Sequence, residues 1–136
     1  MDLYKSMAVS ASGMKAQGTR LKVISENLAN ASTTAETPGD LPYRRKTVVF
    51  KNELDRAMDV DKVRVAKVDV DKSDFQRRYD PSHPSADADG YVLMPNVNSV
   101  VEAMDMREAQ RSYEANLSAI DTARQMLTRT IDILRT

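Results

Sequence analysis

The chain of 136 residues contains no cysteine and no tryptophan, and it has no long apolar run. Without cysteine the chain forms no disulfide and offers no thiol nucleophile, and this absence leaves the compartment open. A membrane-spanning helix needs about 20 mostly apolar residues, and no stretch approaches that length. The opening residues lack the basic flank and apolar run of a secretory signal peptide. We therefore expect no direct membrane insertion and, if the chain leaves the cytosol, export without a cleavable signal peptide.

Aromatic residues and an excess of charge of one sign are also scarce. Aromatics make up 5% of the chain and apolar residues 41%, below the roughly 45 to 50% that is usual for globular domains. Lysine and arginine together number 20, against 20 acidic residues, so the formal net charge is zero. The core must be narrow, and no overall field attracts the chain to nucleic acid. Shape and local pattern therefore select its partners.

What the chain does have is an apolar stripe at each end. From Asp2, a predicted N-cap, to about Asn30, apolar residues recur in alternating steps of four and three, interrupted by Ser10 and Gln17. The C-terminal segment repeats this pattern with one charged interruption. Helices with such stripes pack lengthwise against other helices. The residues expected to pack between helices and between subunits are Leu3, Met7, Met14, Leu21, Ile24, Leu28, Val101, Met104, Tyr113, Leu117, Ile120, Leu127, Ile131 and Leu134.

The C-terminal helix is predicted to begin with a capping box, in which the Ser99 hydroxyl and the Glu102 carboxylate satisfy free backbone N–H groups. It is predicted to run to about Leu134, a length of roughly 50 Å at about 1.5 Å per residue. In the N-terminal helix, Gly13 and Gly18 each cost about 1 kcal/mol relative to alanine. Such residues either mark a close approach of another helix or are ordinary surface positions. The length of the last helix suits a filament or a bundle.

The residues between the helices favour turns and strands. Pro, Gly, Ser and Thr predict a loop over 31–42, and β-branched and aromatic residues predict strands over 43–50, 62–70, 75–79 and 91–94. The alternation of the second strand breaks at Ala66-Lys67, which predicts either a bulge or the end of the strand.

These patterns together predict a mainly α chain with a small β element. The long N- and C-terminal helices are expected to pair as an antiparallel, coiled-coil-like hairpin, with a short β-rich segment between them. The predicted division is a first helix over 1–30, a loop and small β segment over 31–96, and a second helix over 97–136.

No group of residues indicates catalysis, a metal site or a cofactor site. His83 is the only histidine and lies between prolines in a turn-rich segment, so a structural or incidental role is expected. Asp87-Ala88-Asp89-Gly90 lacks the further acidic ligands of a calcium loop, and a tight turn is predicted instead. The chain is therefore expected not to be an enzyme.

Two basic clusters lie beside aromatic residues. Arg44-Arg45-Lys46 follows Tyr43, and Arg77-Arg78 lies between Phe75 and Tyr79. Such clusters are found on nucleic-acid-binding surfaces. The balanced charge and the lack of a binding motif make this the alternative reading, in which the chain is a soluble helical-hairpin adaptor that binds nucleic acid.

Two pairs of segments resemble a known family. Ser25–Asn30 together with Pro42–Lys46 resembles the opening signature of bacterial flagellar rod and hook proteins. Tyr91–Asn98 together with Ala109–Asn116 is similar to the basal-body rod family, and in particular to its short proximal rod member. The motif residues that carry the resemblance are Asn27, Ala29, Asn30, Pro95, Asn96, Val97, Asn98, Tyr113, Glu114, Ala115 and Asn116.

The resemblance implies a structural subunit of the proximal rod of the flagellar basal body, which passes torque through helix packing. It implies partners among the other rod subunits, the rod adaptor protein and further copies of the chain. It also implies export by the flagellar type III apparatus and assembly within the periplasm, with no nucleic acid and no cofactor. The terminal helices would form an inner, channel-lining layer, and the middle segment an outer contact layer. A sibling rod subunit is the alternative within the family.

Overall fold

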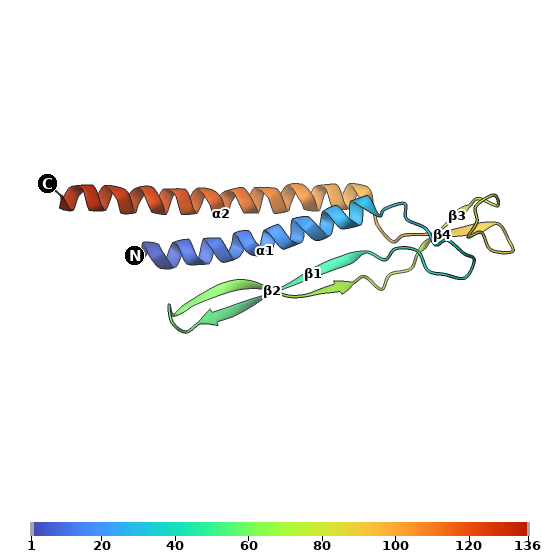
Figure 1. Ribbon diagram of the computed structural model, residues 1–136, viewed down its shortest axis with the longest axis horizontal. Coiled ribbons are helices and arrows are strands. Elements are labelled where there is room, and N and C mark those ends of the chain that lie inside the picture. Colours follow the sequence, from blue (N-terminus) through green and yellow to red (C-terminus); the bar gives the residue numbers. More distant parts are fainter. Residues whose placement is uncertain (1, 136) are drawn as a thin grey trace. The chain divides into compact units, whose positions relative to one another are not determined.

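A computed structural model describes residues 2–135 of the chain (Figure 1). Its elements in chain order are helix α1 (Leu3–Ala29), strands β1 (Lys46–Asp55), β2 (Val60–Val70), β3 (Gln76–Tyr79) and β4 (Tyr91–Met94), and helix α2 (Ser99–Leu134). The prediction of a mainly helical chain, with a small β part between two long helices, is confirmed.

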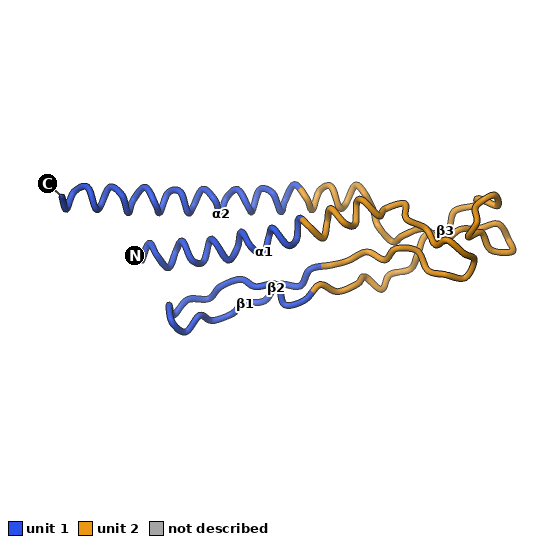
Figure 2. The backbone as a smooth tube through the Cα atoms, in the orientation of Figure 1, with its two compact units in different colours: residues 1–21, 48–67, 107–136 blue, residues 22–47, 68–106 orange. Residues whose placement is uncertain are grey.

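The chain divides into two compact units (Figure 2). Unit 1 comprises Met1–Leu21, Val48–Lys67 and Arg107–Thr136, and unit 2 comprises Lys22–Thr47 and Val68–Met106. Each unit therefore combines part of α1 and part of α2 with segments from the middle of the chain.

Helix α1 begins where the sequence predicts. The Asp2 carboxylate accepts hydrogen bonds from the backbone N–H groups of Tyr4 at 3.0 Å and Lys5 at 3.4 Å. These N–H groups have no partner inside the helix, so an N-cap carboxylate stabilises the first turn. The predicted cap at Asp2 is confirmed.

Helix α2 begins differently from the prediction. The side-chain oxygen of Asn98 accepts the N–H groups of Val100 at 3.0 Å and Val101 at 3.3 Å, and the Asn98 carbonyl accepts the N–H of Glu102. Asn98 is therefore the N-cap, and the predicted capping box of Ser99 with Glu102 is wrong. The Glu102 side chain is directed into the interior instead, where it is fully buried.

Strands β1 and β2 form a two-stranded hairpin (Figure 1). Strand β1 begins later than the predicted strand over 43–50, because Tyr43 and Arg45 hydrogen-bond to Thr33, Asn96 and Asp71. It also continues to Asp55, whose carboxylate accepts the N–H groups of the following turn. Strand β2 runs unbroken to Val70, so it does not end at Ala66-Lys67.

Strands β3 and β4 form a second two-stranded sheet, within unit 2. They pair antiparallel in the register Gln76↔Met94 to Tyr79↔Tyr91. The preceding turn closes with a 3.0 Å bond from the N–H of Gly90 to the Asp87 carbonyl, and Gly90 has φ +81°. That left-handed backbone favours glycine. The predicted strand over 91–94 and the predicted turn before it are confirmed.

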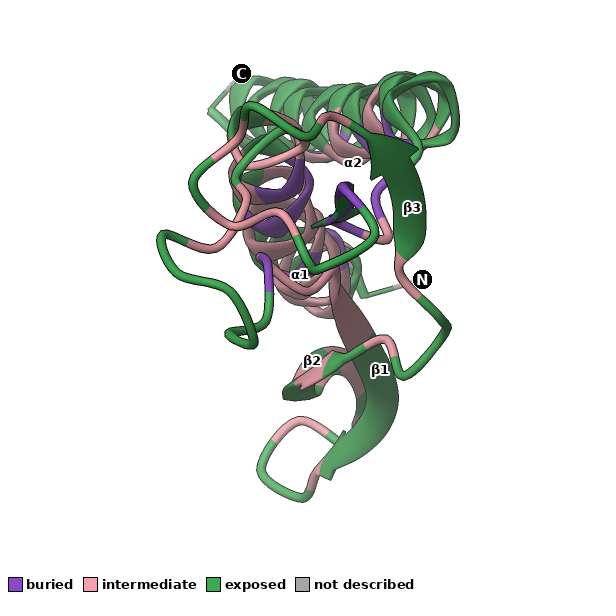
Figure 3. Cartoon of the chain, turned by 90° about the vertical axis from the view of Figure 1, so that its right-hand side faces the viewer, coloured by how far each residue is buried: buried purple, intermediate pink, exposed green. Residues whose placement is uncertain are grey.

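The buried residues are few and mostly small. On α1 the buried positions are Ser10, Ala16, Val23, Ile24 and Asn27. Figure 3 shows buried segments in purple on α1, whereas most of α2 is exposed. On α2 the buried positions are Glu102, Ala109 and Ala123, and around β4 they are Gly90, Val92, Pro95 and Val97. The interior is therefore narrow, as the composition predicts, and the largest apolar side chains of the stripes contribute little to it.

The two glycines of α1 differ in their surroundings. A methyl group added at Gly13 would lie 2.9 Å from Nδ2 of Asn116 on α2, whereas nothing lies within 4 Å of the equivalent position at Gly18. Asn116 is not free to move away, because its Nδ2 donates to the Ser112 carbonyl at 2.9 Å. Gly13 therefore marks a close approach of α2. At Gly18 no such approach occurs within the described part of the isolated chain.

This difference predicts opposite effects of two alanine substitutions. Gly18→Ala is expected to raise the free energy of unfolding by about 1 kcal/mol, since alanine favours the helix. Gly13→Ala is expected to lower it by about 1 kcal/mol, because the overpacking against Asn116 outweighs the same helical gain. Urea titration of the purified chain, followed by circular dichroism, measures both values. An equal rise in both variants would contradict the close approach at Gly13.

Candidate functional site

A buried polar cluster in unit 2 is centred on Asn27. Its Nδ2 donates to the Lys46 carbonyl at 2.8 Å and to the Glu102 carboxylate at 3.1 Å. Its Oδ1 accepts from the Tyr43 hydroxyl and from the Lys46 N–H, each at 2.9 Å. The Asn27 amide thus pairs with both backbone groups of Lys46, as a neighbouring strand would, and fixes the start of β1.

The Glu102 carboxylate is a fully buried charge in this cluster. It pairs closely with the Arg45 guanidinium, which also lies 3.5 Å from Asp71 and 3.6 Å from Asp105. A buried carboxylate needs both a counter-charge and hydrogen bonds, and Arg45 together with Asn27 supplies them. This ion pair ties the first turns of α2 to the segment that leads into β1.

Charge and burial shift the pKa values within the cluster. Burial raises the pKa of Tyr43. Burial alone would lower the pKa of Arg45, but the hydrogen bond and charge of Glu102, with Asp71 and Asp105, outweigh it and raise that pKa. Hydrogen bonds from Ser73 lower the pKa of Asp71. Each shift favours the form that makes the observed contacts, a neutral phenol, a charged guanidinium and a charged carboxylate.

Asn96 extends the cluster from the segment after β4. Its Oδ1 accepts the N–H of Arg45 at 2.8 Å, and its Nδ2 donates to the carbonyl of Asp71 at 3.1 Å and to the hydroxyl of Ser73 at 3.0 Å. One side chain therefore connects the residues before β1 with those after β2. Pro95 and Val97, on either side of Asn96, are buried.

The other motif residues have smaller roles. Asn98 caps α2, Asn30 donates to the Glu26 carbonyl and accepts from Thr33, and Asn116 lies against Gly13. Tyr113 is half-buried, while Ala29, Glu114 and Ala115 are exposed.

Sequence reasoning missed the pairing of Arg45 with Glu102. It assigned Arg45 to a surface basic cluster and Glu102 to a helix cap. The available signal was the position of Glu102 seven residues before Ala109, on the same helix face, which is the buried face of α2.

The two basic clusters are occupied by contacts within unit 2. The Arg44 guanidinium lies over Phe75 at 4.2 Å, and Lys46 pairs with Glu26 at 3.1 Å. Arg77 pairs with Asp87 at 3.1 Å, and Arg78 lies 3.7 Å from Asp80. Each of these basic side chains therefore has a partner within unit 2.

His83 has the structural role that the sequence predicts. Its Nδ1 accepts the N–H of Ser85 at 3.1 Å, and its Nε2 lies 3.1 Å from the Thr34 hydroxyl. It thereby joins two loops of unit 2. Across residues 2–135 no group of three or more histidine, aspartate or glutamate side chains is placed to hold a metal ion.

The predicted packing residues differ in burial and fall into three classes. Ile24 is buried, and the half-buried group comprises Leu3, Met7, Met14, Leu21, Leu28, Tyr113 and Ile120. The exposed group lies wholly on α2 and comprises Val101, Met104, Leu117, Leu127, Ile131 and Leu134. We call the exposed group the α2 apolar surface. Large exposed apolar side chains are typical of interaction surfaces.

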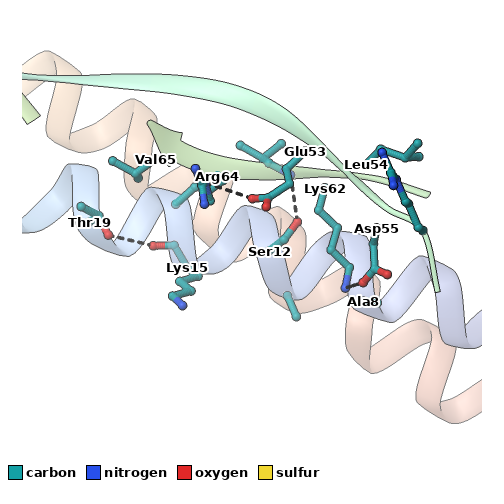
Figure 4. Close-up of a pocket in the computed structure, with 14 residues that line it drawn as sticks. Ala8, Ser12, Lys15, Thr19, Glu53, Leu54, Asp55, Lys62, Arg64 and Val65 are labelled. Atoms are coloured by element: carbon teal, nitrogen blue, oxygen red, sulfur yellow. Dashed lines mark hydrogen bonds and ion pairs between the residues drawn. The ribbon is translucent and has the colours of Figure 1, made fainter. Parts of the chain in front are cut away.

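A groove in unit 1 lies between α1 and the β1–β2 hairpin (Figure 4). It encloses about 900 Å³ and is lined by small residues of α1 and by the end of the hairpin. The Ser12 hydroxyl links the two sides, because it donates to the Val9 carbonyl and accepts the N–H of Val63 at 3.2 Å. Over the described residues, neither helix is both long and apolar enough to cross a membrane.

Comparison with known proteins gives a consistent result. The family model described as "Flagella basal body rod protein" matches residues 7–35, and the C-terminal model of the flagellar basal body rod FlgEFG proteins matches residues 88–133. A flagellar basal-body rod protein FlgC of Agrobacterium fabrum is 52% identical over 98% of this chain and 96% of its own length. Those of Bacillus subtilis and Salmonella typhimurium are each 37% identical over 98% of this chain, covering 99% and 98% of their own lengths.

Proposed function

Since the chain belongs to the family of flagellar basal-body rod proteins FlgC, we propose that it is a structural subunit of the proximal rod. The observation that carries this proposal is the similarity to rod proteins over almost the whole chain, at 37 to 52% identity in three bacteria. Both ends of the chain also match rod family models.

The function of such a subunit is mechanical, and the proposed role includes no catalytic step. Torque passes from subunit to subunit through packed side chains, which resist shear and share the load among many contacts. The α2 apolar surface is proposed to provide these contacts. Its support is that the narrow interior of the chain buries small and polar residues and leaves the large apolar side chains of α2 exposed.

We propose that α1 and α2 pair as an antiparallel, coiled-coil-like hairpin. In unit 1, the contact of Gly13 is with Asn116, and Arg20 pairs with Glu108 at 3.3 Å. The position on α2 thus moves back by eight residues as the position on α1 advances by seven. Such a shift is typical of antiparallel helices. In unit 2, the contact of Asn27 with Glu102 lies near the other ends of the two helices.

The family resemblance also supports a proposal for the layers of the rod. Residues 1–30 and 97–136 are proposed to form the inner, channel-lining layer, and residues 31–96 the outer contact layer. The proposed partners are other rod subunits, the rod adaptor protein, further copies of this chain and the flagellar type III export apparatus. The proposed location is the basal body within the periplasm, reached without a cleavable signal peptide.

Genetic complementation tests the proposed function. In Agrobacterium fabrum lacking its FlgC, expression of this chain is expected to restore swimming, since the two sequences are 52% identical over nearly their full lengths. An affinity-tagged copy is expected in purified basal bodies. Normal cellular levels of the chain without swimming, and without the tag in basal bodies, would contradict the proposal.

A further inference from the structure

The neutral net charge of the chain conceals a division between its two units. Unit 1 carries 13 lysines and arginines against nine acidic residues, a net side-chain charge of +4. Unit 2 carries seven against 11, a net charge of −4. Two copies therefore attract each other when unit 1 of one faces unit 2 of the other, and like units repel.

The groove of unit 1 carries part of the positive charge. Among its lining residues, Glu53 pairs with Arg64 at 3.0 Å and Asp55 pairs with Lys62 at 2.6 Å. The remaining two cations, Lys15 and Arg56, form no ion pair with a described residue. Figure 4 shows the Lys15 side chain pointing away from the hairpin, so its ammonium is accessible to an incoming carboxylate.

Apart from the hydroxyls of Ser12 and Thr19, the rest of the groove lining is apolar. Ala8, Ala11 and Ala16 lie along the α1 side, and Leu54 and Val65 lie on the hairpin side. A segment that fills this groove must therefore present an apolar side chain together with negative charge.

One loop of unit 2 has this composition. Residues 35–41 include Glu36 and Asp40 and no cation, and Leu41 is 66% exposed. The loop is ordered by a turn, in which the N–H of Asp40 donates to the Thr37 carbonyl at 3.3 Å and the Thr37 hydroxyl donates to the Asp40 carboxylate. An ordered loop loses little conformational entropy on binding.

We propose that the groove between α1 and the hairpin receives the acidic loop 35–41 of a second copy of this chain. Leu41 would pack against the small residues of α1, and Glu36 and Asp40 would face Lys15 and Arg56. This inference rests on the proposed function and names one of its subunit contacts. The contact joins different surfaces of the two copies, so it does not close on itself and produces a chain of subunits.

Cysteine cross-linking in cells tests this contact, because the natural chain contains no cysteine. Ala11 and Leu41 are exposed, and the double variant Ala11→Cys/Leu41→Cys places one thiol in the groove and one on the loop. Treatment of swimming cells with a short bismaleimide is expected to give a ladder of dimers, trimers and larger products. In the control pair Leu41→Cys/Ser118→Cys the second thiol lies outside the groove. This pair is expected to give at least about fivefold less cross-linked product.

Charge reversal separates this contact from chance proximity. Adding Lys15→Glu to the cysteine pair is expected to lower the amount of cross-linked product about fivefold. This is the effect of losing an exposed ion pair that contributes about 1 kcal/mol. Adding Glu36→Lys as well is expected to restore the cross-linked product. Lys5→Glu makes the same change of charge outside the groove lining and is expected to have no effect.

Several results would overturn the inference. These are the absence of cross-links in swimming cells, a product that stops at the dimer, a product only within one chain, or failure of Glu36→Lys to restore the ladder. In each case swimming shows that the rod has assembled, so the proposed function stands. Failure of the natural chain to enter basal bodies would instead contradict the proposed function itself.

Discussion

Replacing Glu102 by alanine is expected to lower the free energy of unfolding of the isolated chain by about 3 kcal/mol. The substitution removes the fully buried carboxylate that pairs with Arg45 and accepts from Asn27. Removing one partner of a buried ion pair is costly because the other charge remains buried. Such removals cost roughly 3 to 5 kcal/mol. The expected loss lies at the lower end of that range, because Arg45 is 23% exposed and keeps Asp71 and Asp105 as partners. Urea titration followed by circular dichroism measures the change.

Glu108 provides a matched control on the same helix. Its side chain is 71% exposed and pairs with Arg20 at 3.3 Å. Exposed ion pairs contribute roughly 0.2 to 1 kcal/mol, so Glu108→Ala is expected to cost less than about 1 kcal/mol. Equal losses in Glu102→Ala and Glu108→Ala would show that the buried Glu102 ion pair stabilises the chain no more than an exposed ion pair does.

The elements of this fold were predictable because each carries its own local signal. The apolar periodicity of the two ends indicates helices, and the Asp2 carboxylate indicates where α1 begins. Pro95 indicates where β4 ends. These signals involve neighbours in sequence, and short-range geometry decides them.

The buried cluster was not predictable in the same way, because its members lie far apart in the sequence. Ser99 and Glu102 satisfy the local pattern of a capping box, yet Asn98 caps α2 instead. This competition is resolved by Arg45, 57 residues earlier, which draws the Glu102 carboxylate inward. A local pattern fails when a distant opposite charge offers the same side chain a stronger partner.

The apolar stripes illustrate the same limit. Their periodicity identifies two helices that pack along their length, but it does not say which neighbours cover which side chains. Ser10 interrupts the first apolar stripe of the sequence, yet it is buried, as are Ala16 on α1 and Ala109 on α2. Small residues permit close approach within the chain, so the larger ones remain exposed for other molecules.

Replacing Leu127 or Leu117 by aspartate is therefore expected to abolish swimming while leaving the cellular level of the protein unchanged. Both side chains are more than a third exposed in the isolated chain, at 38% and 42%, so a carboxylate there remains hydrated before assembly. In a packed rod it would lose that water, and the contact would also lose about 2 to 3 kcal/mol of apolar burial. Each 1.4 kcal/mol is about tenfold in association, so incorporation is expected to fall at least about 100-fold.

Ser118→Asp is the matched control, because it introduces the same charge beside Leu117 at an exposed position outside the α2 apolar surface. Swimming and the amount of tagged chain in purified basal bodies are the two measurements. If all three variants swim normally, the α2 apolar surface is not an assembly contact. If Ser118→Asp fails together with the leucine variants, added charge anywhere along α2 blocks assembly. Loss confined to Leu117→Asp and Leu127→Asp assigns the effect to these side chains, because the control differs in position and not in charge.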